Sequence, residues 1–562
     1  MLLSEMISRM RLLPSPANRT PDAAQVAPGA RASGRRAPFP WRGLGALAPG
    51  AGHGAATAGD AVDPDLTGAT EDSREARPGW LFCAFTGASS DGREFIGAAA
   101  EKGAPAVIAA YPAPESPVPA ILVPGEKLRA AASEASRLAF GEPDAGLFRL
   151  GVTGTNGKST VCALAEALLK ANGFRPGVIG TTGFRFPGGE VREAPNTTPE
   201  GPLLWKTLRD MKDGGADAVA MEASSHALEL GRLGTLAFNC AMFLNLSRDH
   251  LDFHGDMESY FKAKCRLFLG PDGTLEAGPG EGGVPLGVVN ADDPYGRRLL
   301  AAPGIGFVGY GFSAPEAAVR GKVVRSDRAG VTLTVTSPKW SAEIRSRLLG
   351  RFNAENLLAA AALGYALDFV PERIAAALSE APGAPGRLAR VGTDDSRFAL
   401  VDYAHAPGAM EAAVSAIREL EPARLIVLFG CGGDRDRGKR PLMARAAARG
   451  DVAILTSDNP RTEDPLAIID DAEPGLVQGG MAKGDPADVA GAGGGRLGKG
   501  VYFVEPDRAK AIALGAELLG EGDIFLVAGK GHEDYQIIGR DKRPFDDSME
   551  TLKALRDRGK ST

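Results

Sequence analysis

The stretch that decides the fold is Phe148–Gly173, FRLGVTGTNGKSTVCALAEALLKANG. Its first residues, FRLGVTG, have the apolar character of a buried strand. A glycine-rich loop follows, and the next residues have helical apolar spacing that ends at Gly173. This order of strand, loop and helix predicts a phosphate-binding loop in a parallel α/β sheet.

The loop supplies the two features that bind a nucleotide phosphate. Glycines let backbone N–H groups turn toward an anion, and the helix N-terminus adds partial positive charge. Lys158 is placed to neutralise phosphate oxygens, and Ser159 to ligate Mg²⁺. Val152 stands where the usual motif has its first glycine, so the loop is a variant. The predicted ATP-binding residues are Gly154, Thr155, Asn156, Gly157, Lys158, Ser159 and Thr160.

Apolar runs and helical stretches alternate along most of the chain, which indicates parallel sheets covered by helices. The predicted strands are 79–85, 104–110, 148–154, 215–222, 238–245, 285–290, 398–403, 424–430, 451–461, 500–506 and 523–531. A Pro/Gly cluster at 382–386 marks a boundary. We expect four segments, namely a disordered extension (1–40), a small α/β domain (41–143), a central P-loop domain with a doubly wound parallel sheet (144–385) and a second open α/β domain (386–562). Residues 472–499 become rich in Gly and Ala, and we interpret them as a surface insertion rather than an element.

Composition excludes several classes of protein. The 562 residues carry a net charge of −6, which argues against a nucleic-acid binder, and no apolar run is long enough to span a membrane. The five cysteines are scattered and form no CxxC pair, which favours reduced thiols in the cytoplasm. The first 40 residues lack the apolar core of a secretory signal; a transit peptide stays open.

Polar residues gather where predicted strands end. Glu222 and His226 follow one strand, and Asp249 and His250 follow the next, where carboxylates and imidazoles suit cations near phosphates. Five of the six histidines lie at such ends, although each alone is equally well interpreted as structural. Lys264 lies just beyond. An ion-pair partner is its ordinary interpretation, and a carbamate formed with CO₂ is the alternative.

Together the motifs resemble the Mur ligase family between about Asp72 and Asp547. They are GVTGTNGKST, MEASSHAL, NLSRDHLDFHG, VVNADDPYG, GRFNAENLLAA, VDYAHAPGAM, FGCGGDRDRGKRPLM, DNPRTEDP and AGKGHEDYQ, in the family's order. The resemblance implies three domains: a UDP-sugar-binding domain, a central ATPase and a C-terminal Rossmann-like domain. It also implies ATP as substrate, Mg²⁺ as cofactor and a monomer.

The resemblance assigns roles to residues in the first two domains. The implied catalytic residues are Lys158, Lys264 (as N6-carboxylysine), Glu222 and His250. The implied metal ligands are Ser159, Glu222, His250 and Lys264. The implied contacts to UDP-N-acetylmuramoyl-L-Ala-D-Glu are Ser73, Thr197, Thr198, Ser224 and Arg232. Leu230 departs from the glutamine often found among these contacts, and Gly408 from the usual aspartate of the DYAH motif.

The choice of amino acid is implied by the DNPR tetrad. Arg461 has a planar fork suited to a carboxylate, and meso-2,6-diaminopimelate has a second carboxylate that lysine lacks. The implied diaminopimelate contacts are Arg435, Asp458, Asn459, Pro460, Arg461, Gly529 and Glu533. Glu533 is suited to the distal ammonium.

The expected activity is therefore ATP-dependent addition of meso-2,6-diaminopimelate to the D-Glu side-chain carboxylate of UDP-N-acetylmuramoyl-L-Ala-D-Glu. An L-lysine-adding relative, a folylpolyglutamate synthase, a plain P-loop ATPase and a non-catalytic ATP-binding scaffold are the alternatives. The base that deprotonates the amine is not identified; His226 and Asp249 are weak candidates.

Overall fold

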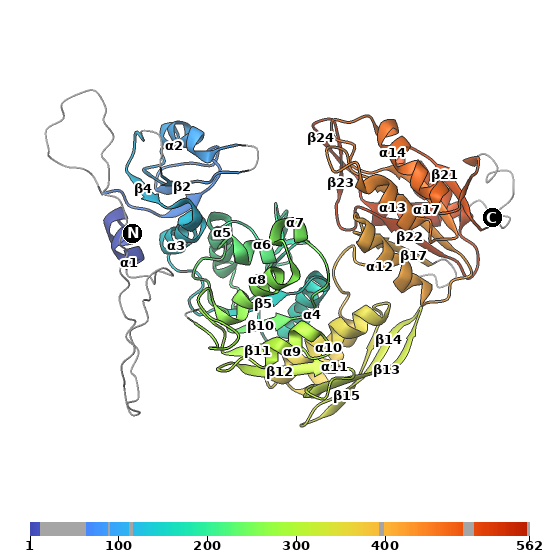
Figure 1. Ribbon diagram of the computed structural model, residues 1–562, viewed down its shortest axis with the longest axis horizontal. Helices are drawn as coiled ribbons and strands as arrows, with labels where there is room; N and C mark the ends of the chain where they lie inside the picture. Colours follow the sequence, from blue (N-terminus) through green and yellow to red (C-terminus); the bar gives the residue numbers. More distant parts are fainter. Residues whose placement is uncertain are drawn as a thin grey trace. The chain divides into compact units, whose positions relative to one another are not determined.

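The computed structural model describes residues 1–11, 63–87, 90–111, 116–280, 282–392, 398–486 and 499–558. They form two compact units, Met1–Val319 with Ala362–Phe369, and Arg320–Ala361 with Val370–Thr562. Figure 1 labels the elements of both units. The boundaries predicted at 143/144 and 385/386 stay predictions. The first unit contains two sheets that share one apolar core.

The N-terminal sheet is small and entirely parallel. It consists of β1 (Gly68–Thr70), β2 (Trp80–Ala84), β3 (Ala106–Ala110) and β4 (Ala120–Val123), in that order. The helices α2 (Ile96–Glu101) and α3 (Leu128–Ala139) cover its two faces, with the short η1 (Gly92–Phe95) and η2 (Gly125–Lys127) before them (Figure 1). Alternation along β2 explains this arrangement, since Phe82 packs with α2 while Leu81 and Cys83 pack with α3. The strands predicted at 79–85 and 104–110 are confirmed.

The first residues are a helix rather than a disordered segment. The helix α1 (Leu3–Arg11) buries Leu3, Met6, Ile7 and Met10 in the core that contains α3. This spacing puts its apolar side chains on one face, and packing against α3 supplies the burial that sequence composition alone did not reveal. The predicted disorder of 1–40 is therefore wrong for Leu3–Arg11, and residues 12–40 lie outside the described part of the chain.

Polar contacts fix α1 as well. The N-terminal ammonium of Met1 lies 2.5 Å from an Asp65 oxygen, and Ser4 bonds Asp63 through both its backbone N–H and its hydroxyl. Arg9 pairs with Glu142 at 2.8 Å. Both ends of the helix are thus tied to residues far away in the sequence.

The central sheet places its phosphate-loop strand in the middle. In the first unit its order is β12-β11-β10-β5-β9-β6-β7-β8, parallel from β12 to β6 and antiparallel at β7 and β8. The strands are β5 (Phe148–Thr153), β6 (Pro176–Gly180), β7 (Gly183–Arg185), β8 (Val191–Arg192), β9 (Ala218–Glu222), β10 (Cys240–Phe243), β11 (Leu286–Asn290) and β12 (Gly306–Gly311). Since β5 pairs with β9 and β10, the polar residues after all three strands meet at one edge.

Helices cover both faces of this sheet. The helices are α4 (Lys158–Ala171), α5 (Gly201–Asp213), α6 (Ser225–Glu229), α7 (Leu251–His254), α8 (Met257–Leu269) and α9 (Pro294–Leu300). Trp205 of α5 and Phe268 of α8 pack in one cluster with Ile179 and Phe243, whereas α4 packs over β6 and β9 with its own buried leucines. Trp205 also donates to the Ser133 hydroxyl of α3 at 2.9 Å, which ties α5 to α3 within the shared core.

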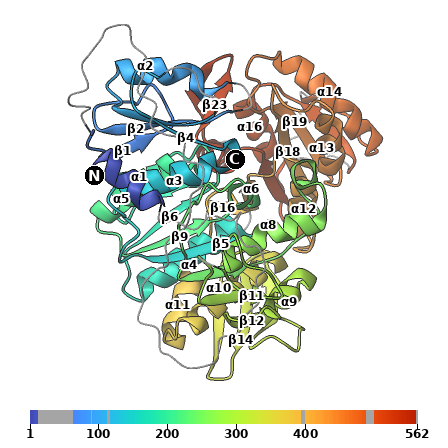
Figure 2. The same cartoon turned by 60° about the vertical axis from the view of Figure 1, so that its left-hand side comes forward.

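The second unit contains a seven-stranded sheet of order β16-β17-β22-β18-β19-β21-β20, parallel except for β16. Its strands are β16 (Ala389–Val391), β17 (Phe398–Asp402), β18 (Leu425–Cys431), β19 (Val452–Ser457), β20 (Ala482–Lys483), β21 (Val501–Val504) and β22 (Ile524–Ala528). One face packs on α12 (Pro407–Arg418), α13 (Lys439–Ala447) and α14 (Pro465–Gln478), and the other on α16 (Arg508–Leu518) and α17 (Asp547–Arg558). Figure 2 shows α13 and α16 on opposite sides of β18 and β19.

The remaining elements are the antiparallel strands β13 (Val319–Asp327), β14 (Gly330–Thr336) and β15 (Ser341–Ser346), the hairpin β23 (Tyr535–Ile538) and β24 (Asp541–Pro544), and the helices α10 (Arg351–Ala366) and α11 (Pro371–Glu380). The strands predicted at 148–154, 215–222, 238–245, 285–290, 398–403, 424–430, 451–461, 500–506 and 523–531 are all present. The α/β fold class is confirmed.

The interpretation of 472–499 as an insertion without elements is wrong at its start. α14 runs to Gln478 and buries Ala472 and Leu476 against the sheet, and β20 follows. The Gly and Ala content hid this amphipathic end of the helix. Residues 487–498 lie outside the described part.

Two further features concern the cysteines and the helices. All five cysteines belong to described residues, and none forms a disulfide. None of the described helices combines the length and apolarity that a membrane crossing requires.

The packing of α1 is testable by one substitution. Met6→Asp places an unpaired carboxylate in a fully buried position and should lower the free energy of unfolding of the first unit by about 3 kcal/mol or more. Thermal unfolding followed by circular dichroism measures the effect. Ser8→Asp, on the exposed face of the same helix, is the control and should change little. Equal stability of Met6→Asp and wild type would contradict this packing.

Candidate functional site

The loop after β5 is closed by backbone and amide contacts. Gly157 has a φ of 87° at the start of α4, a conformation that favours glycine. Asn245, after β10, accepts from the Asn156 N–H through its side-chain oxygen at 2.9 Å and donates to the Asn156 carbonyl at 3.2 Å. The Thr155 N–H donates to the Asn245 carbonyl at 3.0 Å. The Asn245 side-chain amide thus contacts both the backbone N–H and the backbone carbonyl of Asn156. The residue that follows β10 therefore sets the shape of the loop.

Two lysines share one carbonyl in this loop. Lys158 donates to the Gly154 carbonyl at 2.9 Å, and Lys264 of α8 donates to the same oxygen at 3.0 Å. Lys264 is 1% exposed. Burial lowers the pKa of Lys264 far below its ordinary value, and the nearby charge of Lys158 lowers it further. Both effects shift the Lys264 amine toward its neutral, nucleophilic form.

Glu222, at the end of β9, lies beside the loop. Its Oε1 accepts from the Ser159 hydroxyl at 2.8 Å and from the Thr181 N–H at 2.8 Å. The Thr181 hydroxyl contacts Glu222 Oε2 at 3.3 Å and the Thr197 hydroxyl at 3.0 Å. The predicted pair Ser159 and Glu222 is thus in contact, and Thr181 is a partner that sequence reasoning missed.

Four of the predicted substrate contacts gather around this carboxylate. Thr198 donates to the Glu222 carbonyl at 2.8 Å and lies 3.1 Å from the Ser224 hydroxyl. Arg232 donates to the Thr198 carbonyl at 3.1 Å and pairs with Glu200 at 3.0 Å. With Thr197, these side chains form one continuous polar network.

Ser73 lies apart from that network, in the turn after β1, where no described residue is recorded as its side-chain partner. Its neighbour Glu71 connects the two regions. Burial, together with the charge of Glu200, raises the pKa of Glu71 to about 7. Glu71, two residues before Ser73, therefore lies within electrostatic range of Glu200.

The histidines form a ring cluster. His250 has a φ of 53°, an uncommon conformation for a residue other than glycine. The rings of His226 and His250 are 4.9 Å apart, and His254 stacks on Tyr260 at 4.9 Å while bonding Ser225 at 3.0 Å. Burial lowers the pKa of His226, and a charge on His250 lowers it further. At neutral pH this favours an uncharged His226.

The predicted metal ligands are brought only partly together. Ser159 and Glu222 touch, whereas His250 is half exposed and contacts Asp249 at 3.5 Å. Within the described ranges no group of three or more His, Cys, Asp or Glu side chains is close enough to hold a metal. Mg²⁺ commonly binds through one or two protein oxygens and the phosphates of its substrate, so this donor set is compatible with Mg²⁺ on a nucleotide.

The motif VVNADDPYG supports the loop after β10. Asn290 donates to the Leu244 carbonyl at 2.9 Å, and Asp293 accepts from the Leu246 N–H at 2.9 Å. Asp293 also caps α9. These two side chains fix the backbone on both sides of Asn245, and thereby the phosphate loop.

In the second unit, hydrogen bonds join the loop after β18 to the loop after β19. Arg461 donates from its side chain to the Gly433 carbonyl at 2.8 Å, and the Gly433 N–H donates to the Asn459 carbonyl at 2.9 Å. Arg461 has a φ of 52°, and its backbone bonds Ile537 and Gly539 of the β23–β24 hairpin. Such an uncommon backbone conformation in a loop is typical of functional sites.

A buried arginine makes ion pairs with residues next to the same loops. Arg440 is 2% exposed and pairs with Glu463 and Asp471, both at 2.7 Å. Glu463 in turn accepts from the Asp434 N–H at 2.5 Å. Arg435, a predicted contact, is exposed on this framework.

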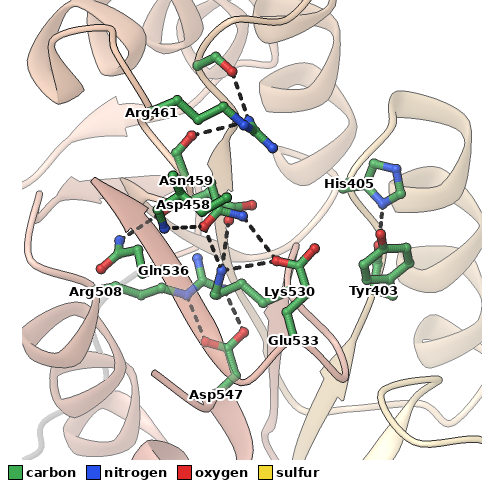
Figure 3. Close-up of polar contacts among 12 residues, drawn as sticks. Tyr403, His405, Asp458, Asn459, Arg461, Arg508, Lys530, Glu533, Gln536 and Asp547 are labelled. Carbon is green, nitrogen blue, oxygen red and sulfur yellow. Dashed lines mark hydrogen bonds and ion pairs between the residues drawn. The ribbon is translucent and has the colours of Figure 1, made fainter. Parts of the chain in front are cut away.

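The DNPR loop meets the AGKGHE turn through buried side chains (Figure 3). Asp458 and Asn459 are each 6% exposed, and Lys530 between them and Glu533 is completely buried. Asn459 donates to Glu533 Oε2 at 3.0 Å. Gly529 has a φ of 120°, and a Cβ there would lie 2.9 Å from Asp458 Oδ2, so the site requires glycine. The predicted diaminopimelate residues are thus assembled from both segments.

The two departures from the family pattern lie at helix ends. Leu230 closes α6, with its N–H donating to the His226 carbonyl at 2.8 Å. Gly408 lies in the first turn of α12, where a Cβ would meet nothing within 4 Å. Neither position changes the contacts described above.

Comparison with known proteins identifies the family. A model of the Mur ligase middle domain matches residues 152–364, and one of the Mur ligase glutamate ligase domain matches 386–531. A protein of Geobacter metallireducens named UDP-N-acetylmuramoyl-L-alanyl-D-glutamate–2,6-diaminopimelate ligase is 42% identical over 89% of this chain and 96% of its own length. The chain belongs to the Mur ligase family.

Other Mur ligases agree with this assignment. A Pseudomonas aeruginosa protein with the same name is 42% identical over 86% of this chain and 94% of its own. A solved structure with that name is 33% identical, with a TM-score of 0.59 over 88% of this chain and 95% of that one. The MurF ligase of Thermotoga maritima in complex with ADP, 18% identical, shares the fold with a TM-score of 0.56 over 88% of this chain and 98% of its own.

The phosphate-binding role predicted for Lys158 can be tested by substitution. Lys158→Ala should reduce ATP-dependent phosphate release at least about 100-fold, because it removes the side-chain positive charge from the phosphate loop. Lys170→Ala, an exposed position on the same helix, is the control and should retain normal turnover. Normal turnover of Lys158→Ala would exclude the loop as the phosphate site.

Proposed function

We propose that this Mur ligase adds meso-2,6-diaminopimelate to the D-Glu side-chain carboxylate of UDP-N-acetylmuramoyl-L-Ala-D-Glu, with ATP converted to ADP and phosphate, in the synthesis of peptidoglycan precursors. The observation that carries this proposal is the junction of the DNPR loop and the AGKGHE turn, which places Arg461 and Glu533 on either side of Asn459 (Figure 3). A planar cation and a carboxylate match the carboxylate and ammonium of one amino-acid end.

The first step brings two anions together. The D-Glu carboxylate attacks the γ-phosphorus of ATP, forming an acyl phosphate and releasing ADP. Lys158 and the N–H groups of residues 154–160 bind the phosphates and offset their charge. Bound Mg²⁺ would supply further positive charge there, and Ser159, Glu222 and His250 would be the residues that hold it.

The second step forms the amide. The neutral amine of diaminopimelate attacks the acyl phosphate, the amide bond forms, and phosphate leaves while the amine gives up a proton. The acceptor of that proton is not assigned. His226 has the lowered pKa of an uncharged base at neutral pH, and Asp249 is the second candidate.

The UDP-linked dipeptide would bind along the polar network of Thr197, Thr198, Ser224 and Arg232, with Ser73 at the nucleotide end. Hydroxyls and one guanidinium suit a ligand that carries carboxylate, amide and sugar groups. The enzyme would act as a monomer in the cytoplasm, where ATP is available and its five unpaired thiols stay reduced.

We propose that Lys264 acts as N6-carboxylysine. A neutral buried amine combines with CO₂ to give a carbamate and a proton, which turns the side chain into an anion near Lys158. The low pKa of Lys264 supports this step, because a protonated amine cannot attack CO₂. The carbamate would then be a ligand for Mg²⁺.

Lys264→Ala tests the carbamate. Ligation should fall at least about 100-fold and recover in part with added acetate or formate, because a small carboxylate replaces the lost anion. Lys262→Ala, exposed on the same helix two residues earlier, is the control and should need no carboxylate. Full activity of Lys264→Ala without supplement would exclude the carbamate.

Arg461→Ala tests amino-acid recognition. The KM for diaminopimelate should rise about 10–100-fold, with the KM for ATP unchanged, because a charge-assisted contact to the distal carboxylate is lost. Arg543→Ala, an exposed arginine of the adjacent hairpin, is the control. An unaltered KM for diaminopimelate would contradict the role of the DNPR loop.

Phosphate release by the purified protein tests the function as a whole. ATP, Mg²⁺ and UDP-N-acetylmuramoyl-L-Ala-D-Glu would be supplied with either meso-2,6-diaminopimelate or L-lysine. We expect release with diaminopimelate only. Release with lysine only would favour the lysine-adding alternative, and release without dipeptide or amine would favour a plain ATPase.

A further inference from the structure

A lysine with no side-chain exposure lies at the centre of the predicted amino-acid site. Lys530 belongs to the turn after β22. Its ammonium lies 3.1 Å from Asn459 Oδ1, 3.2 Å from Glu533 Oε2 and 3.4 Å from Asp458 Oδ1 (Figure 3). An ammonium has three donors and no acceptor, so three oxygens at these distances satisfy it completely.

The ammonium determines which way the Asn459 amide faces. Asn459 Oδ1 accepts from Lys530 and also from the Ile537 N–H at 2.9 Å. The amide nitrogen must then point to the other side, where it donates to Glu533 Oε2 at 3.0 Å. Lys530 therefore acts on Glu533 twice, directly and through Asn459.

These contacts leave one carboxylate oxygen for a ligand. Both donors reach Glu533 Oε2, and among the described residues Oε1 has no hydrogen-bond partner. A carboxylate held through one oxygen has a fixed plane and presents the other oxygen in one direction. That geometry suits a single ammonium donor.

Charge balance requires Lys530 in particular. Asp458 and Glu533 are two carboxylates removed from most solvent, and one ammonium between them leaves one net negative charge. A second buried cation nearby, Arg508, is already bound by Asp547 through two hydrogen bonds of 2.7 and 2.6 Å. It cannot replace Lys530 without breaking that pair.

We infer that Lys530 is a positioning residue for the acceptor amino acid: it orients Glu533 toward the substrate ammonium and limits the site to one negative charge. The inference rests on the proposed function. Lys530 itself does not touch the substrate, since its three donors are used by Asp458, Asn459 and Glu533.

Steady-state kinetics of Lys530→Met provide the test. The KM for meso-2,6-diaminopimelate should rise at least about tenfold, while the KM for ATP and for the UDP-linked dipeptide stay within about twofold. Lys553→Met, which removes an exposed lysine of α17, is the control and should leave all three unchanged. A parallel change in all three, or none, would overturn the inference.

A second variant keeps the test decisive if Lys530→Met fails to fold. Lys530→Met/Glu533→Gln has the same net charge at the site as wild type. Compared with Glu533→Gln alone, it should change the KM for diaminopimelate by no more than about threefold, because the group that Lys530 orients is already altered. A further tenfold rise, or a double variant that also does not fold, would assign Lys530 to general stability and overturn the inference.

The wild-type enzyme separates this inference from the proposed function. Wild type that releases no phosphate with diaminopimelate would contradict the proposed function. Active wild type with an unaffected Lys530→Met variant would contradict only the role of Lys530.

Discussion

Each unit has a buried lysine beside the loops at the carboxyl ends of its parallel strands, and the groups around that lysine determine what it can do. Lys264 meets a carbonyl and a second cation, so burial and repulsion both disfavour its charge. Lys530 meets two carboxylates and an amide oxygen, which are partners for a charge. The same residue type thus meets surroundings that disfavour its charge in one unit and oxygen partners for its ammonium in the other.

Sheet order is what brings the chemistry together. β5 lies between β9 and β10, so Glu222 and Asn245 reach the phosphate loop from either side. In the second unit, β19 and β22 end at the DNPR loop and the AGKGHE turn, which Lys530 and Asn459 join. Arg461 takes an uncommon backbone conformation at this junction, and contacts with the β23–β24 hairpin hold it there.

Much of the fold could be predicted from the sequence, because buried parallel strands are short apolar runs and glycine-rich loops leave a clear pattern. The helix α1 and the end of α14 were missed, because only the fold shows which surfaces their few apolar residues pack against. The motifs named candidate site residues, and within each unit the fold brings several of them into contact. They could not reveal that Lys530 is completely buried, or that its partner Asn459 lies 71 positions away. Thr181 was missed for the same reason, because only the fold brings it to Glu222.

The central claim is that the second unit selects an amino acid whose far end carries a carboxylate as well as an ammonium. A competition experiment tests it most directly: the purified enzyme receives ATP, Mg²⁺, UDP-N-acetylmuramoyl-L-Ala-D-Glu and equal concentrations of meso-2,6-diaminopimelate and L-lysine, and mass spectrometry identifies the product. The account predicts the diaminopimelate adduct almost alone, with that preference much reduced in Arg461→Ala. A wild-type product mixture in proportion to the two amines, or a preference for lysine, would contradict it.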